Sequence, residues 1–72
     1  MKAKKIGFDN TSIWVETTDE KIGSLSLKAF KKLANVTKEQ LLKFELWNDN
    51  QWIHWEEIGE DLSVEGFFSF HN

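Results

Sequence analysis

The stretch Phe44-Glu45-Leu46-Trp47-Asn48-Asp49-Asn50-Gln51-Trp52-Ile53-His54-Trp55 decides the fold of this chain. Apolar and polar side chains alternate on both sides of an Asn-Asp-Asn-Gln segment, which is typical of a β-hairpin. A loop of two or of four residues places Trp47 opposite Trp52, so both loops give the same register. One face of this hairpin is wholly apolar and is expected to be core; it carries Phe44, Leu46, Ile53 and Trp55.

The opposite face of the hairpin is mixed, and it carries Glu45, Trp47, Trp52 and His54. In one interpretation the two indoles pack beneath a carboxy-terminal helix, and Glu45 bonds to the imidazole of His54. In the other, two exposed indoles beside an acid and a histidine form a binding surface, because Trp is enriched among interface hot spots. We favour the first interpretation, since a small core needs every large ring.

Three further strands are predicted before this hairpin, around 4–8 and over 12–17 and 22–27, where β-branched and aromatic residues gather. A two-residue loop between the last two strands sets Val15 opposite Ser24, and a three-residue loop over 19–21 sets it opposite Leu25. The second register is preferred because it collects the apolar side chains on one face. That face carries Ile13, Val15, Leu25 and Leu27, and the other face carries Trp14, Glu16, Ser24 and Ser26.

Helical segments are expected to be short. The spacing over 28–33 predicts one helical turn, and 37–40 form a capping box with Thr37 as N-cap and Gln40 three residues later. Ser63 is expected to cap a last helix over 64–70. The sequence thus predicts a single small α+β domain over 1–72, built from a small antiparallel sheet of two hairpins with short helices.

Composition limits the chemistry that is available. The chain has 72 residues and contains no cysteine, so disulfides, thiolate metal sites and cysteine nucleophiles are excluded. No apolar run approaches the roughly 20 residues of a membrane-spanning helix, and no secretory signal is visible, so a cytoplasmic location is expected. The acid run with Glu56, Glu57, Glu60 and Asp61 is expected to be a solvated loop. No catalytic residue, metal site or cofactor is predicted.

The charges divide along the chain. All nine lysines lie in residues 1–43, with five acids, whereas residues 44–72 carry seven acids and no lysine. A segment this acidic, in a chain without arginine, disfavours general DNA binding. Lys28, Lys31, Lys32 and Lys38 still form a small basic patch if their segments are adjacent.

The order of several motifs resembles the small bacterial domain-of-unknown-function family 2442. The most specific of them are Ile53-His54-Trp55 and Glu60-Asp61-Leu62-Ser63-Val64-Glu65-Gly66, within a match over about 12–68. The family usually has Asp-Gly where this chain has Asp19-Glu20. The resemblance implies an α+β fold, similar to the amino-terminal domain of longer helix-turn-helix proteins, which this chain is expected to lack. It also implies a neighbouring gene partner, in a paired, toxin–antitoxin type of arrangement.

These observations predict a small non-catalytic protein-binding module, the antitoxin-like or regulatory member of a two-protein system. The expected binding residues are Trp47, Trp52, His54, Glu45 and Asp61, with the acidic second half steering a basic protein partner. The alternative is a nucleic-acid-binding transcriptional regulator that uses the lysine patch, and it predicts an affinity that falls steeply with salt.

Overall fold

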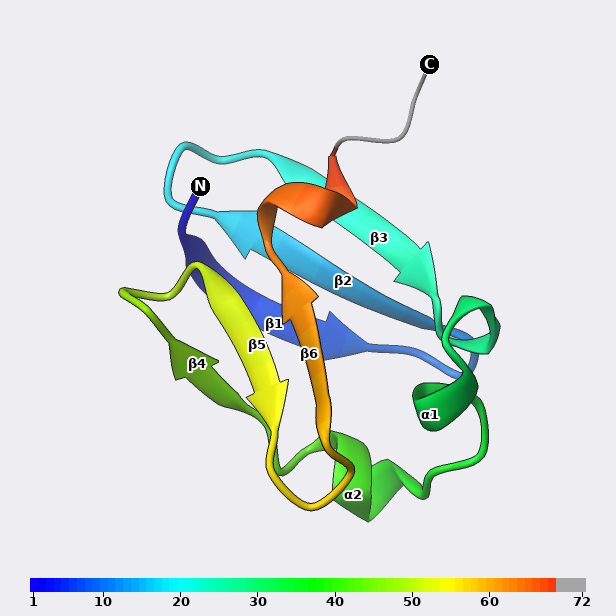
Figure 1. The fold of residues 1–72 in the computed structure, drawn as a ribbon. Coiled ribbons are helices and arrows are strands. Elements are labelled where there is room, and N and C mark those ends of the chain that lie inside the picture. The colour runs from blue at the N-terminus through cyan, green and yellow to red at the C-terminus, as the bar shows by residue number, and fades with distance from the viewer. Residues whose placement is uncertain (69–72) are drawn as a thin grey trace.

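The computed structural model describes residues 1–68, which form two three-stranded antiparallel sheets joined by short helical segments (Figure 1). The first sheet has the order β1–β2–β3 and the second has the order β4–β5–β6. The elements are β1 (Ala3–Phe8), β2 (Ser12–Thr17), β3 (Ile22–Ser26), η1 (Leu27–Ala29), α1 (Lys31–Ala34), α2 (Lys38–Leu41), β4 (Glu45–Trp47), β5 (Trp52–Trp55), β6 (Glu60–Ser63) and η2 (Glu65–Phe67). The predicted α+β class is confirmed, and each predicted hairpin carries a third strand.

The two sheets enclose one apolar core (Figure 1). Strand β2 contributes Ile13 and Val15, and strand β5 contributes Ile53 and Trp55; all four are buried. Alternate residues of each strand point inward, as the sequence pattern predicts for both hairpins. The helical segments, β6 and the residue between β6 and η2 complete this core with Leu27, Leu33, Leu41, Leu62, Val64 and Phe67.

The register of the first hairpin differs from the predicted one. Val15 lies opposite Gly23, and Leu25 lies opposite Ile13, so the predicted pairing of Val15 with Leu25 is wrong by two residues. The loop has three residues, as predicted, but it spans 18–20, and the backbone N–H of Thr17 donates to the carbonyl of Lys21 over 2.9 Å. A shift of two residues keeps every side chain on its predicted face, because side chains alternate with a period of two.

The second hairpin has the predicted register, with Trp47 opposite Trp52 and Glu45 opposite His54. Its loop has three consecutive residues with positive φ, namely Asn48 (55°), Asp49 (59°) and Asn50 (63°). Asn and Asp tolerate this conformation better than other non-glycine residues. Asn50 also forms two hydrogen bonds with Ala3 of the first sheet. Its backbone carbonyl accepts the Ala3 N–H over 2.8 Å, and its side-chain amide donates to the Ala3 carbonyl over 3.3 Å.

Strand β6 pairs with β5 and was not predicted. Its acidic residues, which the sequence suggested were part of a solvated loop, lie in the sheet. The predicted helix over 64–70 is a single turn, η2, and positions 69 and 70 lie outside the described residues. Ser63 does act as a cap, because its hydroxyl accepts the backbone N–H of Gly66 over 3.3 Å.

The remaining helical segments match their predictions. The Thr37 hydroxyl accepts the N–H of Gln40 over 3.1 Å, and the Gln40 side chain accepts the N–H of Thr37 over 3.0 Å, so the capping box is confirmed. The predicted turn over 28–33 is divided between η1 and α1. Among residues 1–68, no helix has the length and apolar character needed to cross a membrane.

Candidate functional site

The outer face of the second sheet carries two rows of directly opposed residues. One row runs from Glu45 on β4 through His54 on β5 to Asp61 on β6. The next row runs from Trp47 through Trp52 to Ser63. We call the five residues Glu45, Trp47, Trp52, His54 and Asp61 the tryptophan face. The structure therefore brings together all five predicted binding residues, with Asp61 supplied by the unpredicted strand.

Both indoles of the tryptophan face are open to solvent. Trp47 is 47% exposed and Trp52 is 42% exposed, so the favoured interpretation, in which a terminal helix covers them, is wrong for the described residues. The physical reason is that the core already contains Trp55 and the aliphatic side chains of both sheets. Trp47 and Trp52 are directly opposed, and a contiguous exposed apolar patch marks an interaction site more often than a single exposed apolar residue does.

Trp47 is held in one orientation by two polar neighbours. Its indole N–H donates to a Glu45 carboxylate oxygen over 3.0 Å. Its ring stacks on the imidazole of His54, with ring centroids 3.7 Å apart and planes 24° apart. A side chain fixed in this way loses little conformational entropy when a ligand binds to it.

The sequence suggested a bond between Glu45 and the imidazole of His54, but the structure does not have it. The Nδ1 of His54 bonds to a carboxylate oxygen of Asp61, and its Nε2 lies 2.9 Å from a carboxylate oxygen of Glu56. The prediction failed because β6, which brings Asp61 to the other side of His54, was not recognised. The hydrogen bond to Asp61, followed by that to Glu56, raises the pKa of His54 above its ordinary value of 6.5.

A hollow of about 290 Å³ opens between the two indoles. It is lined by Trp47, Asn48, Trp52 and Asp61. Asn48 was missed as a site residue because a turn asparagine is fully explained by its positive φ. Its position directly after Trp47 in the sequence was the signal that could have pointed to it.

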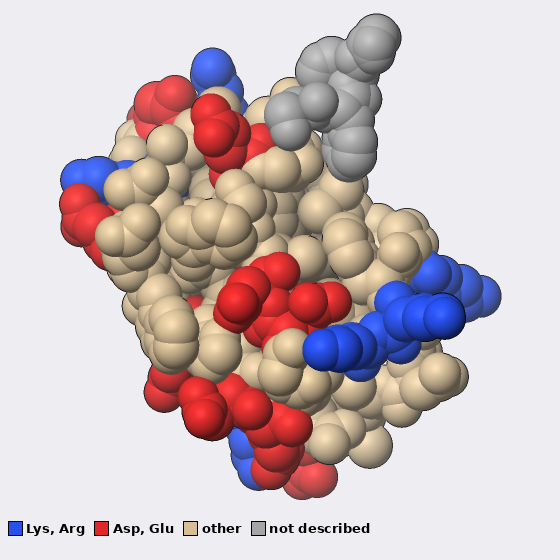
Figure 2. Space-filling model, viewed as in Figure 1, with Lys and Arg blue, Asp and Glu red and all other residues tan. Residues whose placement is uncertain are grey.

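Charge is distributed unevenly around the site. Figure 2 shows acidic side chains gathered over the second sheet and lysines at the edge beside α1, on the face that it displays. Lys32 reaches from α1 toward the β5–β6 turn, where its Nζ donates to the carbonyl of Gly59 over 3.0 Å. In the described part of the chain, no lysine forms an ion pair with Glu45, Glu56 or Asp61.

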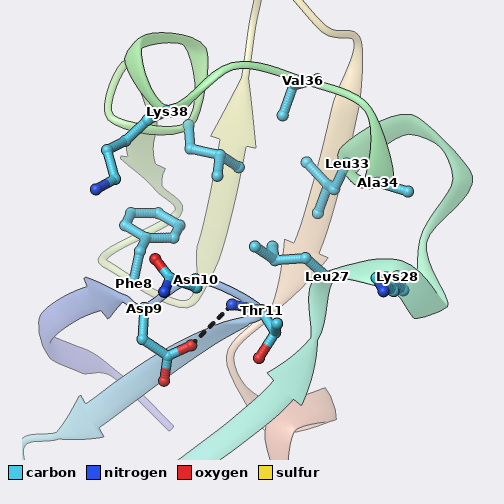
Figure 3. A pocket seen from close by; sticks show the side chains of 11 residues that line it. Phe8, Asp9, Asn10, Thr11, Leu27, Lys28, Leu33, Ala34, Val36 and Lys38 are labelled. Atoms are coloured by element: carbon cyan, nitrogen blue, oxygen red, sulfur yellow. Dashed lines mark hydrogen bonds between the residues drawn. The ribbon is translucent and has the colours of Figure 1, made fainter.

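A second hollow of about 190 Å³ lies between the β1–β2 turn and the helical segments (Figure 3). Its apolar wall includes Leu27 and Leu33, and Lys28 and Lys38 lie on its rim. Of the four lysines proposed for nucleic acid, Lys28 and Lys38 thus lie at this hollow, whereas the Nζ of Lys32 bonds to Gly59 in the β5–β6 turn. The Asp9 carboxylate beside the hollow is also occupied, since it accepts the backbone N–H groups of Thr11 (3.1 Å, drawn in Figure 3) and Ser12 (2.8 Å).

Within residues 1–68, no group of three or more histidine and carboxylate side chains is arranged to hold a metal ion. The two carboxylates nearest His54 bond to different ring nitrogens and so do not converge on one point.

Comparisons with known proteins bear on the fold and the family. The chain is similar to a protein of unknown function from Rhodospirillum rubrum ATCC 11170, whose crystal structure was determined at 2.75 Å resolution. The TM-score is 0.77 at 22% sequence identity, over 90% of this chain and 81% of that one, so the fold is shared. No curated protein matches the sequence. The model of the family described as "Protein of unknown function (DUF2442)" matches residues 3–69, and the chain therefore belongs to this family.

Proposed function

We propose that this chain is a small non-catalytic protein-binding module whose contact surface is the tryptophan face. The observation that carries the proposal is the exposed pair Trp47 and Trp52, directly opposed on β4 and β5. Trp residues supply a large apolar area with few rotatable bonds, and they dominate many interfaces. Exposed indoles contribute little hydrophobic stabilisation to the free domain, and a bound partner would bury this apolar area.

The partner is expected to be basic. Four acids, Glu56, Glu57, Glu60 and Asp61, follow β5 or lie in β6. One of them, Asp61, lines the hollow between the exposed indoles. The field of these acids would speed the approach of a positively charged protein and disfavour an acidic one. A role as the antitoxin-like or regulatory member of a two-protein system follows from the gene pairing that the family resemblance implies.

The test is affinity capture from an extract of the cells that carry this gene, with the tagged wild-type chain and two variants. Trp52→Ala removes an indole from the tryptophan face. Ile22→Ala removes an exposed apolar side chain, 70% exposed, from the first sheet and serves as the matched control. We expect one stoichiometric protein to be recovered with the wild type and Ile22→Ala, and at least a tenfold loss with Trp52→Ala.

Equal recovery with all three folded proteins would contradict the proposal, as would recovery of no protein. Recovery of nucleic acid that Lys28→Gln and Lys38→Gln abolish would support the regulator alternative instead. For the antitoxin role, the captured protein should slow growth when it is expressed alone, and co-expression of this chain should restore growth.

A further inference from the structure

The hollow between the indoles combines two kinds of group that attract cations. Two of its four lining residues are the indoles of Trp47 and Trp52, and a third is the carboxylate of Asp61. The face of an indole carries negative electrostatic potential and attracts a cation held against it. A carboxylate in the same hollow adds a full negative charge and acceptor oxygens.

The geometry of the hollow is set before any ligand arrives. Trp47 is fixed by its bond to Glu45 and by its stack on His54, and His54 is fixed by Asp61 and Glu56. One face of the Trp47 ring is therefore already occupied. The Asp61 contact with His54 uses one carboxylate oxygen, and a carboxylate offers about four acceptor positions in all.

The net charge around the hollow is negative in either protonation state of His54. Glu45, Glu56 and Asp61 supply three negative charges, and protonated His54 supplies at most one positive charge. Each of these carboxylates is exposed and, among the described residues, none is paired with a lysine. A cationic side chain of a partner would compensate this net negative charge.

We propose that this hollow is a subsite for one arginine side chain of the protein partner, with the guanidinium flat against the Trp52 indole and hydrogen-bonded to Asp61. The inference rests on the proposed function and specifies the chemistry of that partner. Arginine fits better than lysine because its planar guanidinium stacks on an aromatic ring and donates several hydrogen bonds in that plane. A neutral sugar ring would also stack on Trp, but it would leave the net negative charge around the hollow uncompensated.

The test uses the tripeptide acetyl-Gly-Arg-Gly-amide, with the citrulline tripeptide as the neutral isosteric control. Binding is followed at pH 7.5 by the indole N–H signals of the four Trp residues in ¹H–¹⁵N NMR spectra. We expect the Trp52 signal to shift with the arginine peptide and the Kd to be at least fivefold weaker for citrulline. Asp61→Asn should weaken arginine binding at least threefold. Glu57→Gln, which removes the same charge from an exposed residue outside the hollow, should change it less than twofold.

Three results would overturn the arginine subsite. These are equal affinity for the arginine and citrulline peptides, equal effects of Asp61→Asn and Glu57→Gln, and tighter binding of a neutral oligosaccharide such as cellotetraose. The protein-binding proposal is judged separately by the capture experiment. A Trp52-dependent partner without arginine binding would reject this subsite alone, and arginine binding without a Trp52-dependent partner would reject the protein-binding module.

Discussion

The indole N–H of Trp55 donates a hydrogen bond of 3.0 Å to the carbonyl oxygen of Leu41. Trp55 ends β5 and Leu41 ends α2, so this buried bond joins the second sheet to the helical segment that precedes it. The last carbonyl groups of a helix have no partner within the helix, and here a core side chain satisfies one of them. Trp55 is thus both the largest buried side chain and a helix-capping donor.

Trp55→Phe should lower the free energy of unfolding by about 2–4 kcal/mol, because it opens a cavity and leaves a buried carbonyl without a donor. Trp52→Phe is the matched control on the same strand, and its exposed ring should make the loss less than about 1 kcal/mol. Urea unfolding followed by circular dichroism measures both. Equal losses in the two variants would show that the bond to Leu41 contributes little.

The two hairpins show why one register was predictable from the sequence and the other was not. In the second hairpin, Leu46 meets Ile53 and Trp47 meets Trp52, so the side chains themselves define the pairing. In the first hairpin, the residue opposite Val15 is Gly23, which has no side chain to indicate which face of the sheet it lies on. Matching the apolar residues pairwise then placed Leu25 two positions away from its true partner.

Strand β6 was missed for a different reason. Glu60 and Asp61 have low strand propensity, and an acidic run usually reads as solvated. The indication of a strand was the alternation of Leu62, which is buried, with the more exposed polar residues Asp61 and Ser63 on either side of it. Without β6, Glu45 was the predicted cross-strand partner of His54, whereas in the structure Asp61 and Glu56 bond to its imidazole.

Glu20→Gly should stabilise the protein by about 0.5–1 kcal/mol. Glu20 has a φ of 66°, a left-handed conformation that costs a residue with a Cβ about 1–2 kcal/mol and costs glycine almost nothing. The greater freedom of glycine in the unfolded chain offsets part of this gain. The glycine that the family usually has at this turn position agrees with the observed φ.

Thr18→Gly is the control for this turn, because Thr18 is exposed and does not have a positive φ. It should lower stability by about 0.5–1 kcal/mol through the unfolded state alone. In a domain of this size, each 1 kcal/mol moves Tm by about 4–8 °C, so thermal unfolding resolves the two variants. A lower Tm for Glu20→Gly would refute the strain argument.

Gly7→Ala should destabilise the first sheet by about 1–3 kcal/mol. A Cβ added at Gly7 would lie 1.9 Å from the ring of Trp14, which is directly opposite on β2, so the ring would have to move. At Gly66 the nearest atom to an added Cβ is 3.8 Å away, an ordinary contact. Gly66→Ala should therefore be neutral or slightly stabilising, and chemical denaturation of both variants checks the contrast. Comparable stability of the two would mean that Trp14 has another position of similar energy.

The pKa of His54 should fall in both Asp61→Asn and Glu56→Gln, and further in the first variant. Both carboxylates favour the imidazolium, and the hydrogen bond to Asp61 is the larger cause of the raised pKa. Titration of the imidazole C–H signals by NMR gives the values. His71→Gln identifies the His54 signal, since the chain has two histidines. Glu57→Gln, which removes a charge that does not bond to His54, should give the smallest change.

The raised pKa of His54 also predicts how the free energy of unfolding depends on pH. Because the pKa of His54 is higher in the folded state than its ordinary 6.5, protonation favours folding. The stabilisation is fully present below about 6.5, the unfolded-state value, and is lost as pH rises through the folded-state pKa. Asp61→Asn should therefore cost more stability at pH 5.5 than at pH 9, as measured by urea unfolding, and pH 5.5 is high enough to keep an ordinary carboxylate ionised. A cost that is the same at both pH values would mean that the Asp61 contact does not depend on the charge of His54.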